Sequence, residues 1–203
     1  QKLLGDVHKA FTTQINDILL YALAKTLSSL HGNDNSQIYL EGHGRESLFE
    51  DLDISRTIGW FTSLYPVNLK YRSELSTADQ IKHFKESLRK IPHNGLGYGV
   101  LKYLKKVPEL ELAPSPIASF NYLGQFEDGE TKSDLKISSH KTGQTIATHL
   151  LLTTGLELNS YIRNSKLEIS LTYSNQKITP DIAEKLMQDY IQNLKAVIDF
   201  CLQ

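Results

Sequence analysis

Apolar residues recur at helical spacing in three stretches of the chain. Between residues 13 and 30 they return every three or four positions, and Gly32 follows where a left-handed C-terminal cap belongs. The same spacing predicts a second helix over residues 78–91, which Pro92 ends. A third helix is predicted to begin at Pro180, because proline is favoured at the first helical position. Its apolar face is predicted to consist of Ile182, Leu186, Tyr190, Leu194, Val197 and Cys201.

Short segments with strand character lie between these helices. Residues 38–40 form the first, and residues 63–69 form the second, in which Pro66 implies an edge strand or a bulge. Residues 117–122 form the third.

The clearest strand signal is a hairpin near the C-terminus. Residues 155–162 and 166–173 flank a turn at 163–165, and the second strand alternates apolar and polar positions. The order of elements is helix, strand, strand, helix, strand, hairpin, helix. This order predicts an α/β fold, a two-layer sandwich with a mixed β-sheet and helices on one face.

Residues 124–149 interrupt this pattern. They are polar and poorly periodic, and they contain three glycines. We interpret them as a long arm, because segments of this length in compact domains are usually either functional or without regular structure.

The charge balance excludes two classes of partner. The chain has 203 residues, of which 22% are charged, and its formal net charge is −1. Its isoelectric point is about 6.7. Such a chain offers no basic field for nucleic acid or an anionic membrane, and no stretch is apolar enough to span a bilayer. We expect one or two domains with a core of their own and neither of these partners.

The cysteine and histidine content of the chain argues against disulfides and metal sites. Cys201 is the single cysteine, which excludes an internal disulfide and any multi-cysteine metal site and fits a reducing, cytoplasmic location. The histidines show no metal-ligand spacing, so no metal is predicted. The opening residues 1–5 resemble neither a signal peptide nor a normal start, so we interpret the chain as a piece of a longer one.

The densest chemistry lies at residues 41–46, directly after the first predicted strand. The segment Glu-Gly-His-Gly-Arg-Glu holds two carboxylates, an imidazole and a guanidinium, which can tune one another's pKa, and two glycines that let the backbone approach a bound molecule. Strand alternation places Glu41 on the face of Tyr39. Two interpretations of Glu41 stay open. It is either an acid, base or orienting carboxylate of a reaction, or one half of a structural ion pair with Arg45.

The next two ionisable groups also have two interpretations each. His43 lies between the glycines, where it either contacts a ligand or holds the loop by bonding backbone carbonyls; we favour the second. Arg45 either binds an anion or pairs with Glu46 or Asp53, and we favour the ion pair.

Two further motifs carry weaker signals. Residues 56–62 place Trp60 beside Phe61 after a glycine, which indicates either a core plug under a loop or a binding cage; we favour the plug. The glycines of residues 95–99 are spaced as in a phosphate-binding loop, but no strand precedes them and no Lys-Ser/Thr follows. We therefore predict a tight turn that starts a short helix near residues 98–105.

Asn121 is the candidate polar residue of the third predicted strand. Alternation places it opposite Phe120 and Tyr122. It either faces a cleft as a hydrogen-bond donor or is a satisfied buried amide, and the two interpretations are equally well supported.

Five motifs in a fixed order resemble the C-terminal half of an epimerization domain from a nonribosomal peptide synthetase. Residues 13–20 are similar to the family's "TxINDxLL" helix, residues 41–46 to its "EGHGRE" and residues 56–67 to its "RTVGWFTSxYPV". Residues 91–99 are similar to "xPxxGxGYG" and residues 120–126 to "FNYLGQF". The second and third motifs together separate epimerization domains from condensation domains, which share the fold.

The resemblance implies a lobe similar to chloramphenicol acetyltransferase, with residues 1–203 as the C-terminal lobe. A peptidyl carrier protein would bring an aminoacyl or peptidyl thioester, on its 4'-phosphopantetheine arm, into a tunnel between two lobes. The enzyme, an isomerase that binds no cofactor directly, would remove the Cα proton and return it to the opposite face. The implied catalytic residues are Glu41 and Asn121, and the implied substrate-binding or loop-organising residues are His43, Arg45, Trp60 and Tyr65. We also expect Arg45 to help hold Glu41 ionised.

The family's "HHxxxDG" motif, which supplies a histidine, is missing from this sequence. We therefore expect the N-terminal lobe of the same domain to lie elsewhere in a longer chain, and we predict that this chain alone is inactive. Residues 124–149 are the candidate for the crossover segment that such a lobe sends onto its partner lobe. Two other functions stay open: a condensation lobe that forms peptide bonds between carrier-bound substrates, against which residues 41–46 argue, and a non-catalytic lobe that only docks a carrier protein.

Overall fold

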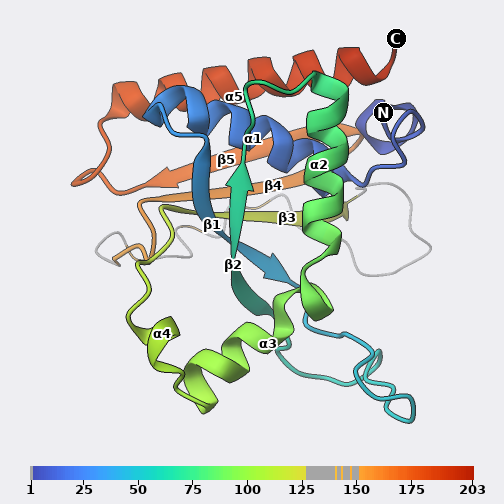
Figure 1. The fold of residues 1–203 in the computed structure, drawn as a ribbon, viewed down its shortest axis with the longest axis vertical. Coiled ribbons are helices and arrows are strands. Elements are labelled where there is room, and N and C mark those ends of the chain that lie inside the picture. The colour runs from blue at the N-terminus through green and yellow to red at the C-terminus, as the bar shows by residue number, and fades with distance from the viewer. Residues whose placement is uncertain (1, 127–139, 141–142, 144–146, 148–150) are drawn as a thin grey trace.

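The computed structural model describes residues 2–126, 140, 143, 147 and 151–203 (Figure 1). Within them, five strands form one mixed sheet and the longer helices cover one of its faces, which confirms the predicted α/β two-layer sandwich. The strands are β1 (Asn35–Gly42), β2 (Ser63–Lys70), β3 (Ala118–Phe126), β4 (Leu156–Arg163) and β5 (Lys166–Tyr173). The helical segments are η1 (Lys2–Leu4), η2 (Asp6–His8), α1 (Ile15–His31), α2 (Thr77–Arg89), η3 (Pro92–Gly95), α3 (Leu96–Gly99), η4 (Val100–Leu104), α4 (Pro108–Glu111) and α5 (Pro180–Cys201). None of the helices in the described ranges combines the length and apolar character that a membrane crossing requires.

The strand order across the sheet is β2-β1-β3-β4-β5. The three central strands run parallel, and β2 and β5 are antiparallel to their neighbours at the two edges. Pro66 therefore lies in an edge strand, as predicted, where its missing N–H costs no ladder hydrogen bond. The parallel register sets Tyr39 beside Ser119 and Ser119 beside Glu157, so these three side chains form a row on one face.

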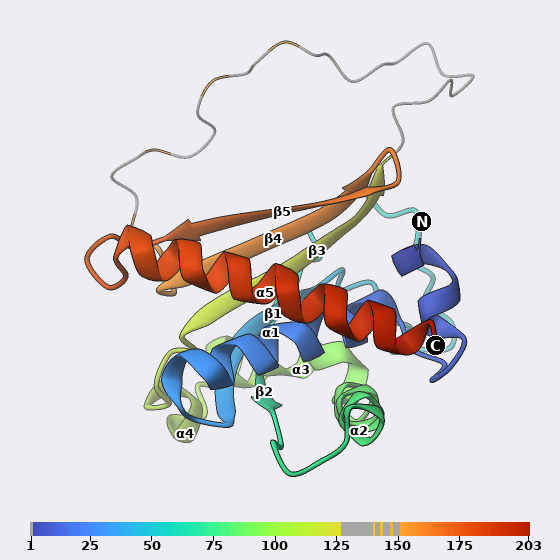
Figure 2. The ribbon, with the colours of Figure 1, turned by 90° about the horizontal axis from the view of Figure 1, so that it is seen from above.

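Helices α1 and α5 lie against the opposite face of the sheet (Figure 2). Gly32 ends α1 in the left-handed conformation, with φ +63°, which confirms the predicted cap. The core is centred on α1, and the Tyr190 hydroxyl of α5 donates a hydrogen bond to the carbonyl oxygen of Leu19 at 3.3 Å. The α1 side chains that are fully buried are Ile18, Leu19, Leu20, Leu23 and Leu27.

The predicted apolar face of α5 is correct except at its first position. Ile182 is 42% exposed, and Ala183 is buried instead. At about 100° per residue, Ala183 falls within the arc formed by the other buried positions, whereas Ile182 lies at its margin. A spacing of three or four residues admits either position before Leu186, so the angular position around the helix axis, rather than the spacing alone, distinguishes them.

Strand β3 continues beyond its predicted end. Its pairing with β4 shifts register between Tyr122 and Gln125, around Gly124 with φ +100°, and then resumes to Phe126. The prediction ended at residue 122 because this irregularity breaks the alternation of side chains. Residues 124–126 therefore belong to the sheet, and most of the predicted arm 124–149 lies outside the described residues.

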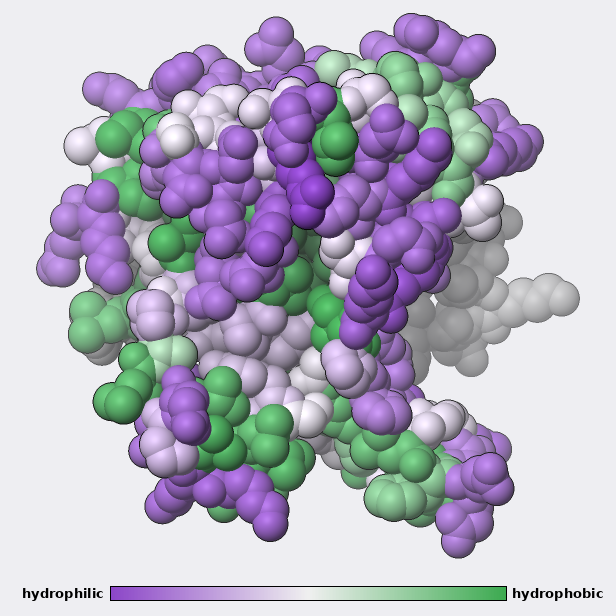
Figure 3. All heavy atoms as spheres, viewed as in Figure 1, coloured by the Kyte–Doolittle hydropathy of each residue, from purple (hydrophilic) through white to green (hydrophobic). Residues whose placement is uncertain are grey.

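The glycine-rich segment is a turn that begins a helix, as predicted. Gly95, with φ +77°, precedes the short α3, and the π-helical η4 follows it. A Cβ on Gly95 would lie only 2.0 Å from Cγ of Tyr65, so this turn packs directly on the tyrosine ring. Helices α3 and α4 extend from the same end of the sheet as the loop 43–62 (Figure 1). Hydrophobic side chains gather on the surface at that end (Figure 3).

Candidate functional site

Glu41 lies near the end of β1 on the face of the sheet opposite α1 and α5. Its neighbour Leu40 is buried towards the core, whereas Glu41 and Tyr39 line the open face together, as alternation predicted. The Glu41 Oε2 atom accepts a hydrogen bond of 2.6 Å from Nδ2 of Asn121, which comes from the neighbouring parallel strand β3. The two implied catalytic residues, 80 positions apart in the sequence, are therefore in direct contact.

Both residues line a hollow of about 170 Å³ on this face. Its walls come from β1, β2, β3, β4 and the segment before β4. The residues that line it are Tyr39, Glu41, Leu64, Ser119, Asn121, Thr153, Thr154, Glu157 and Asn159.

The sequence analysis missed several residues of the hollow, above all Glu157. Glu157 and Asn159 occupy the polar positions of β4, whose burial alternates strictly along the strand. That alternation was visible in the sequence. The pairing of β4 with β3 was not visible, and it is this pairing that places Glu157 in one row with Ser119 and Tyr39.

The electrostatics of the hollow favour a carboxyl group that exchanges protons. Partial burial raises the pKa of Glu41 above its usual value, and the negative charge of Glu157 raises it further. The hydrogen bond from Asn121 opposes the rise, because it stabilises the ionised carboxylate. A carboxyl group whose pKa moves towards the working pH is suited to both taking and returning a proton.

His43 organises the loop that follows Glu41. Its Nδ1 atom accepts a hydrogen bond of 3.0 Å from the backbone N–H of Arg45, and its Nε2 atom lies 3.4 Å from Oε1 of Glu46. The favoured loop-holding role fits these contacts, but the expected partners were wrong. The imidazole contacts a backbone N–H and a carboxylate, because the chain turns back within two residues and brings one donor and one acceptor to the ring.

Arg45 joins the two motifs at residues 41–46 and 56–62. Its guanidinium donates to the carbonyl oxygen of Ile54 at 2.6 Å and to that of Gly59 at 3.5 Å, and it lies 4.2 Å from the centre of the Phe61 ring. The expected ion pair with Glu46 or Asp53 is therefore replaced by bonds to carbonyl oxygens. Arg45 is not among the groups that shift the pKa of Glu41. The structure therefore does not support the expectation that Arg45 helps hold Glu41 ionised.

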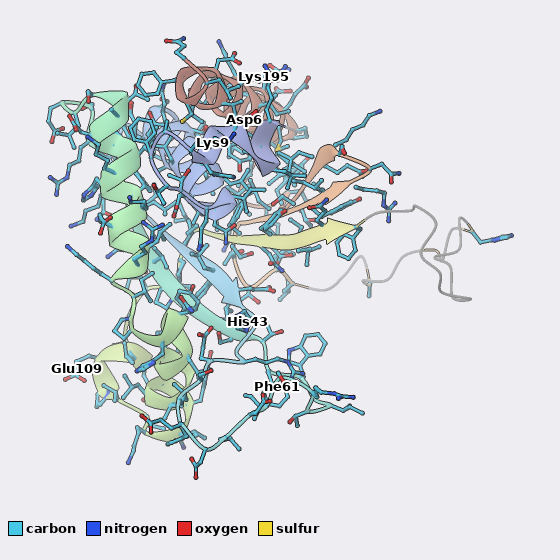
Figure 4. All side chains as sticks on the ribbon, turned by 90° about the vertical axis from the view of Figure 1, so that its right-hand side faces the viewer. Asp6, Lys9, His43, Phe61, Glu109 and Lys195 are labelled. Carbon is cyan, nitrogen blue, oxygen red and sulfur yellow. The ribbon has the colours of Figure 1, made fainter. Side chains whose placement is uncertain are left out.

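Gly44 completes this packed unit. Its φ is +67°, and a Cβ at this position would lie 1.6 Å from the carbonyl oxygen of Phe61. His43 and Phe61 lie beyond the same end of the sheet (Figure 4). The loop also encloses a larger hollow of about 550 Å³, but residues 43–55 form its walls and Glu41 is not among them.

Trp60 and Tyr65 lie away from the hollow. Trp60 is 92% exposed, so the core plug predicted for it is wrong; Phe61 alone turns inward, under Arg45. Tyr65 is buried on the helix-covered face, against the turn at Gly95. The register explains this, because Leu64 pairs with Glu41 and the next residue of β2 must face the other way.

The chain is similar to a known domain family and to several synthases. The Condensation domain family model matches residues 1–203. The chain is 40% identical over 201 residues to bacitracin synthase 2 of Bacillus licheniformis, covering 99% of this chain and 8% of that protein. It is also 40% identical over 215 residues to gramicidin S synthase 1 of Brevibacillus brevis, of which it covers 20%.

Two solved domains superpose on this chain. The epimerization domain from the third module of tyrocidine synthetase B superposes with a TM-score of 0.88 at 36% identity, covering 99% of this chain and 45% of that one. The condensation domain from the Monacolin K polyketide synthase superposes with a TM-score of 0.71 at 20% identity, which shows a shared fold. The chain thus spans less than half of either solved domain.

Proposed function

Because this chain belongs to the Condensation domain family, we propose that it is the C-terminal lobe of an epimerization domain. The domain interconverts the L- and D-configurations at Cα of a carrier-bound aminoacyl or peptidyl thioester. The observation that carries this proposal is the Glu41 carboxylate, held by Asn121 at 2.6 Å in an open hollow with its pKa raised. The 36% identity to a solved epimerization domain, across nearly the whole chain, supports it.

Glu41 is the acid–base group of this mechanism. The thioester carbonyl acidifies the Cα–H bond, and Glu41 takes the proton as the bonding electron pair moves into an enolate. Asn121 keeps the carboxylate aimed at the hollow. A second group returns a proton to the opposite face of Cα, and the proposal assigns that role to a histidine on the N-terminal lobe of the same domain.

Because the proposed site is shared between two lobes, the proposal also implies two partners for this chain. A peptidyl carrier protein presents the substrate on 4'-phosphopantetheine, so the chain itself holds no cofactor. The hollow is open on the side away from the helices, where the N-terminal lobe would close it. Closure would remove water and strengthen the electrostatic interactions within the site.

The experiment compares this chain with the two-lobed domain. A carrier protein loaded with an aminoacyl thioester is incubated in D₂O, and Cα deuterium is measured by mass spectrometry together with the D/L ratio. We expect exchange by the two-lobed domain, none by this chain alone, and a loss of about 10²-fold or more in Glu41→Gln.

Glu168→Gln is the matched control. It makes the same change on the same open face, where Glu168 accepts a hydrogen bond of 2.6 Å from the Tyr161 hydroxyl, outside the hollow. Full exchange in Glu41→Gln would refute the proposal. Amide formation from two loaded carriers, without exchange, would assign the chain to peptide-bond formation, and carrier binding without either reaction would assign it to docking.

A further inference from the structure

The hollow that holds Glu41 is anionic. Its described lining residues include two carboxylates, Glu41 and Glu157, and no lysine, arginine or histidine. The remaining described side chains of the lining are hydroxyls, amides and one leucine. A partly desolvated pair of like charges without a counterion favours the binding of a cation.

Among the described residues, Glu157 is the member of this pair that has no partner. The Glu41 carboxylate has the Asn121 amide as a donor, whereas the Glu157 carboxylate makes no hydrogen bond or ion pair with any described residue. Glu157 is half-buried on β4, two strands away from β1, which separates the two backbones by about 10 Å. Both glutamates line the same hollow of about 170 Å³, which has room for one small group near the two carboxylates.

The reaction proposed above offers a cation of the right size. A free aminoacyl thioester carries an α-ammonium directly on the carbon that loses its proton, about 1.5 Å away. A peptidyl thioester carries a neutral amide at the same place. An ammonium held by Glu157 would set Cα between the two carboxylates, with its C–H bond within reach of Glu41.

We propose that Glu157 is a specificity-determining residue that binds the α-ammonium group, so that the site prefers aminoacyl thioesters to N-acylated or peptidyl ones. This inference rests on the proposed function. The contribution of Glu157 to the raised pKa of Glu41 supports this inference, because it shows that the two carboxylates interact electrostatically. Docking of the ammonium would offset the charge of Glu157 and favour the ionised, proton-accepting form of Glu41.

The test compares two substrates that differ at the α-nitrogen, which is an ammonium in one and an uncharged acetylated amide in the other. Alanyl and N-acetylalanyl thioesters are loaded onto the same carrier protein, and Cα deuterium exchange by the two-lobed domain gives kcat and KM for each. We expect the unmodified domain to exchange the alanyl thioester at least tenfold more efficiently. In Glu157→Gln we expect kcat/KM for the alanyl thioester to fall about tenfold, mainly through KM, and that for the N-acetyl thioester to stay within about twofold.

The controls separate this inference from the function on which it rests. Glu168→Gln is expected to change neither substrate. An equal fall for both substrates in Glu157→Gln, no fall for either, or no preference in the unmodified domain would overturn the role of Glu157 while leaving Glu41 in place. Exchange that survives Glu41→Gln, or no exchange of either thioester by the unmodified domain, would instead overturn the proposed function and this inference with it.

Discussion

Replacement of Gly44 by alanine tests whether the two loop motifs form one packed unit. Gly44 has φ +67°, and an added Cβ would lie 1.6 Å from the carbonyl oxygen of Phe61 and 2.6 Å from its carbonyl carbon. Both atoms belong to the backbone, so no side-chain rotation relieves the contact. The Phe61 backbone would have to retreat by about 1.8 Å to reach an ordinary contact of 3.4 Å.

The loss of unfolding free energy in Gly44→Ala can be estimated for two cases, a loop that keeps its conformation and a loop that moves, and the two estimates are similar. If the loop keeps its conformation, the left-handed backbone costs alanine about 1–2 kcal/mol, and the residual clash adds to this. If the loop moves instead, Arg45 loses its contact with the Phe61 ring, worth about 0.5–1 kcal/mol at an exposed site. It also loses two hydrogen bonds, to Ile54 and Gly59, each worth about 1 kcal/mol. Either route gives a loss of about 2–4 kcal/mol, within the 5–15 kcal/mol stability of an ordinary domain.

Urea unfolding followed by circular dichroism measures this loss on the chain itself. Gly97→Ala is the matched control, because a Cβ at Gly97 meets nothing within 4 Å and its backbone has no positive φ. We expect that variant to be neutral or up to about 1 kcal/mol more stable. Hydrogen exchange of the Arg45 amide, which donates to His43, reports whether the loop opens. The reasoning is wrong if Gly44→Ala unfolds at the same urea concentration as Gly97→Ala with an equally protected Arg45 amide.

The remaining predictions concern the carboxylate and the core. Asn121→Ala removes the donor that stabilises ionised Glu41, so the pKa of that carboxyl should rise further, whereas Arg45→Ala should leave it in place; carbon-13 NMR titration of the chain checks both. A raised pKa means that folding favours the protonated carboxyl, so Glu41 opposes stability increasingly as pH rises through that pKa. Glu41→Gln should therefore match the parent protein in acid and equal or exceed it at pH 7 in urea unfolding; a less stable variant at pH 7 contradicts this. Leu186→Ala, at a fully buried position of α5, should cost about 2–5 kcal/mol in the same assay, and a loss below 1 kcal/mol would show that the helix is not part of the core.

Much of the fold could be predicted from local sequence patterns alone. The cap at Gly32, the hairpin of β4 and β5, the start of α5 at Pro180 and the edge position of Pro66 each depend on a few neighbouring residues. Helical spacing, proline geometry and left-handed glycine are short-range rules, so the sequence carries them directly. The same holds for the face of Glu41, because side chains alternate along any strand.

Pairing between distant segments was not available in this way. The sequence placed Asn121 on the third predicted strand and Glu41 directly after the first, and the parallel register of β1 and β3 brought them within 2.6 Å. Glu157 joined them only through the pairing of β3 with β4, and Tyr65 left the site because β2 pairs with β1 in the opposite phase. Register depends on the packing of a whole sheet against its helices, and a shift of one residue would exchange the two faces.

The loop shows the same division between sequence and tertiary structure. Local sequence determined that residues 41–46 hold reactive groups and that glycine must bend the chain there. Only the folded chain decided that Arg45 would bond carbonyls of a segment nine or more residues away and cover Phe61, leaving Trp60 exposed. Composition and periodicity define what each segment can form by itself. The partners of each charged side chain depend on which segments meet, and that is settled by burying the whole apolar core at once.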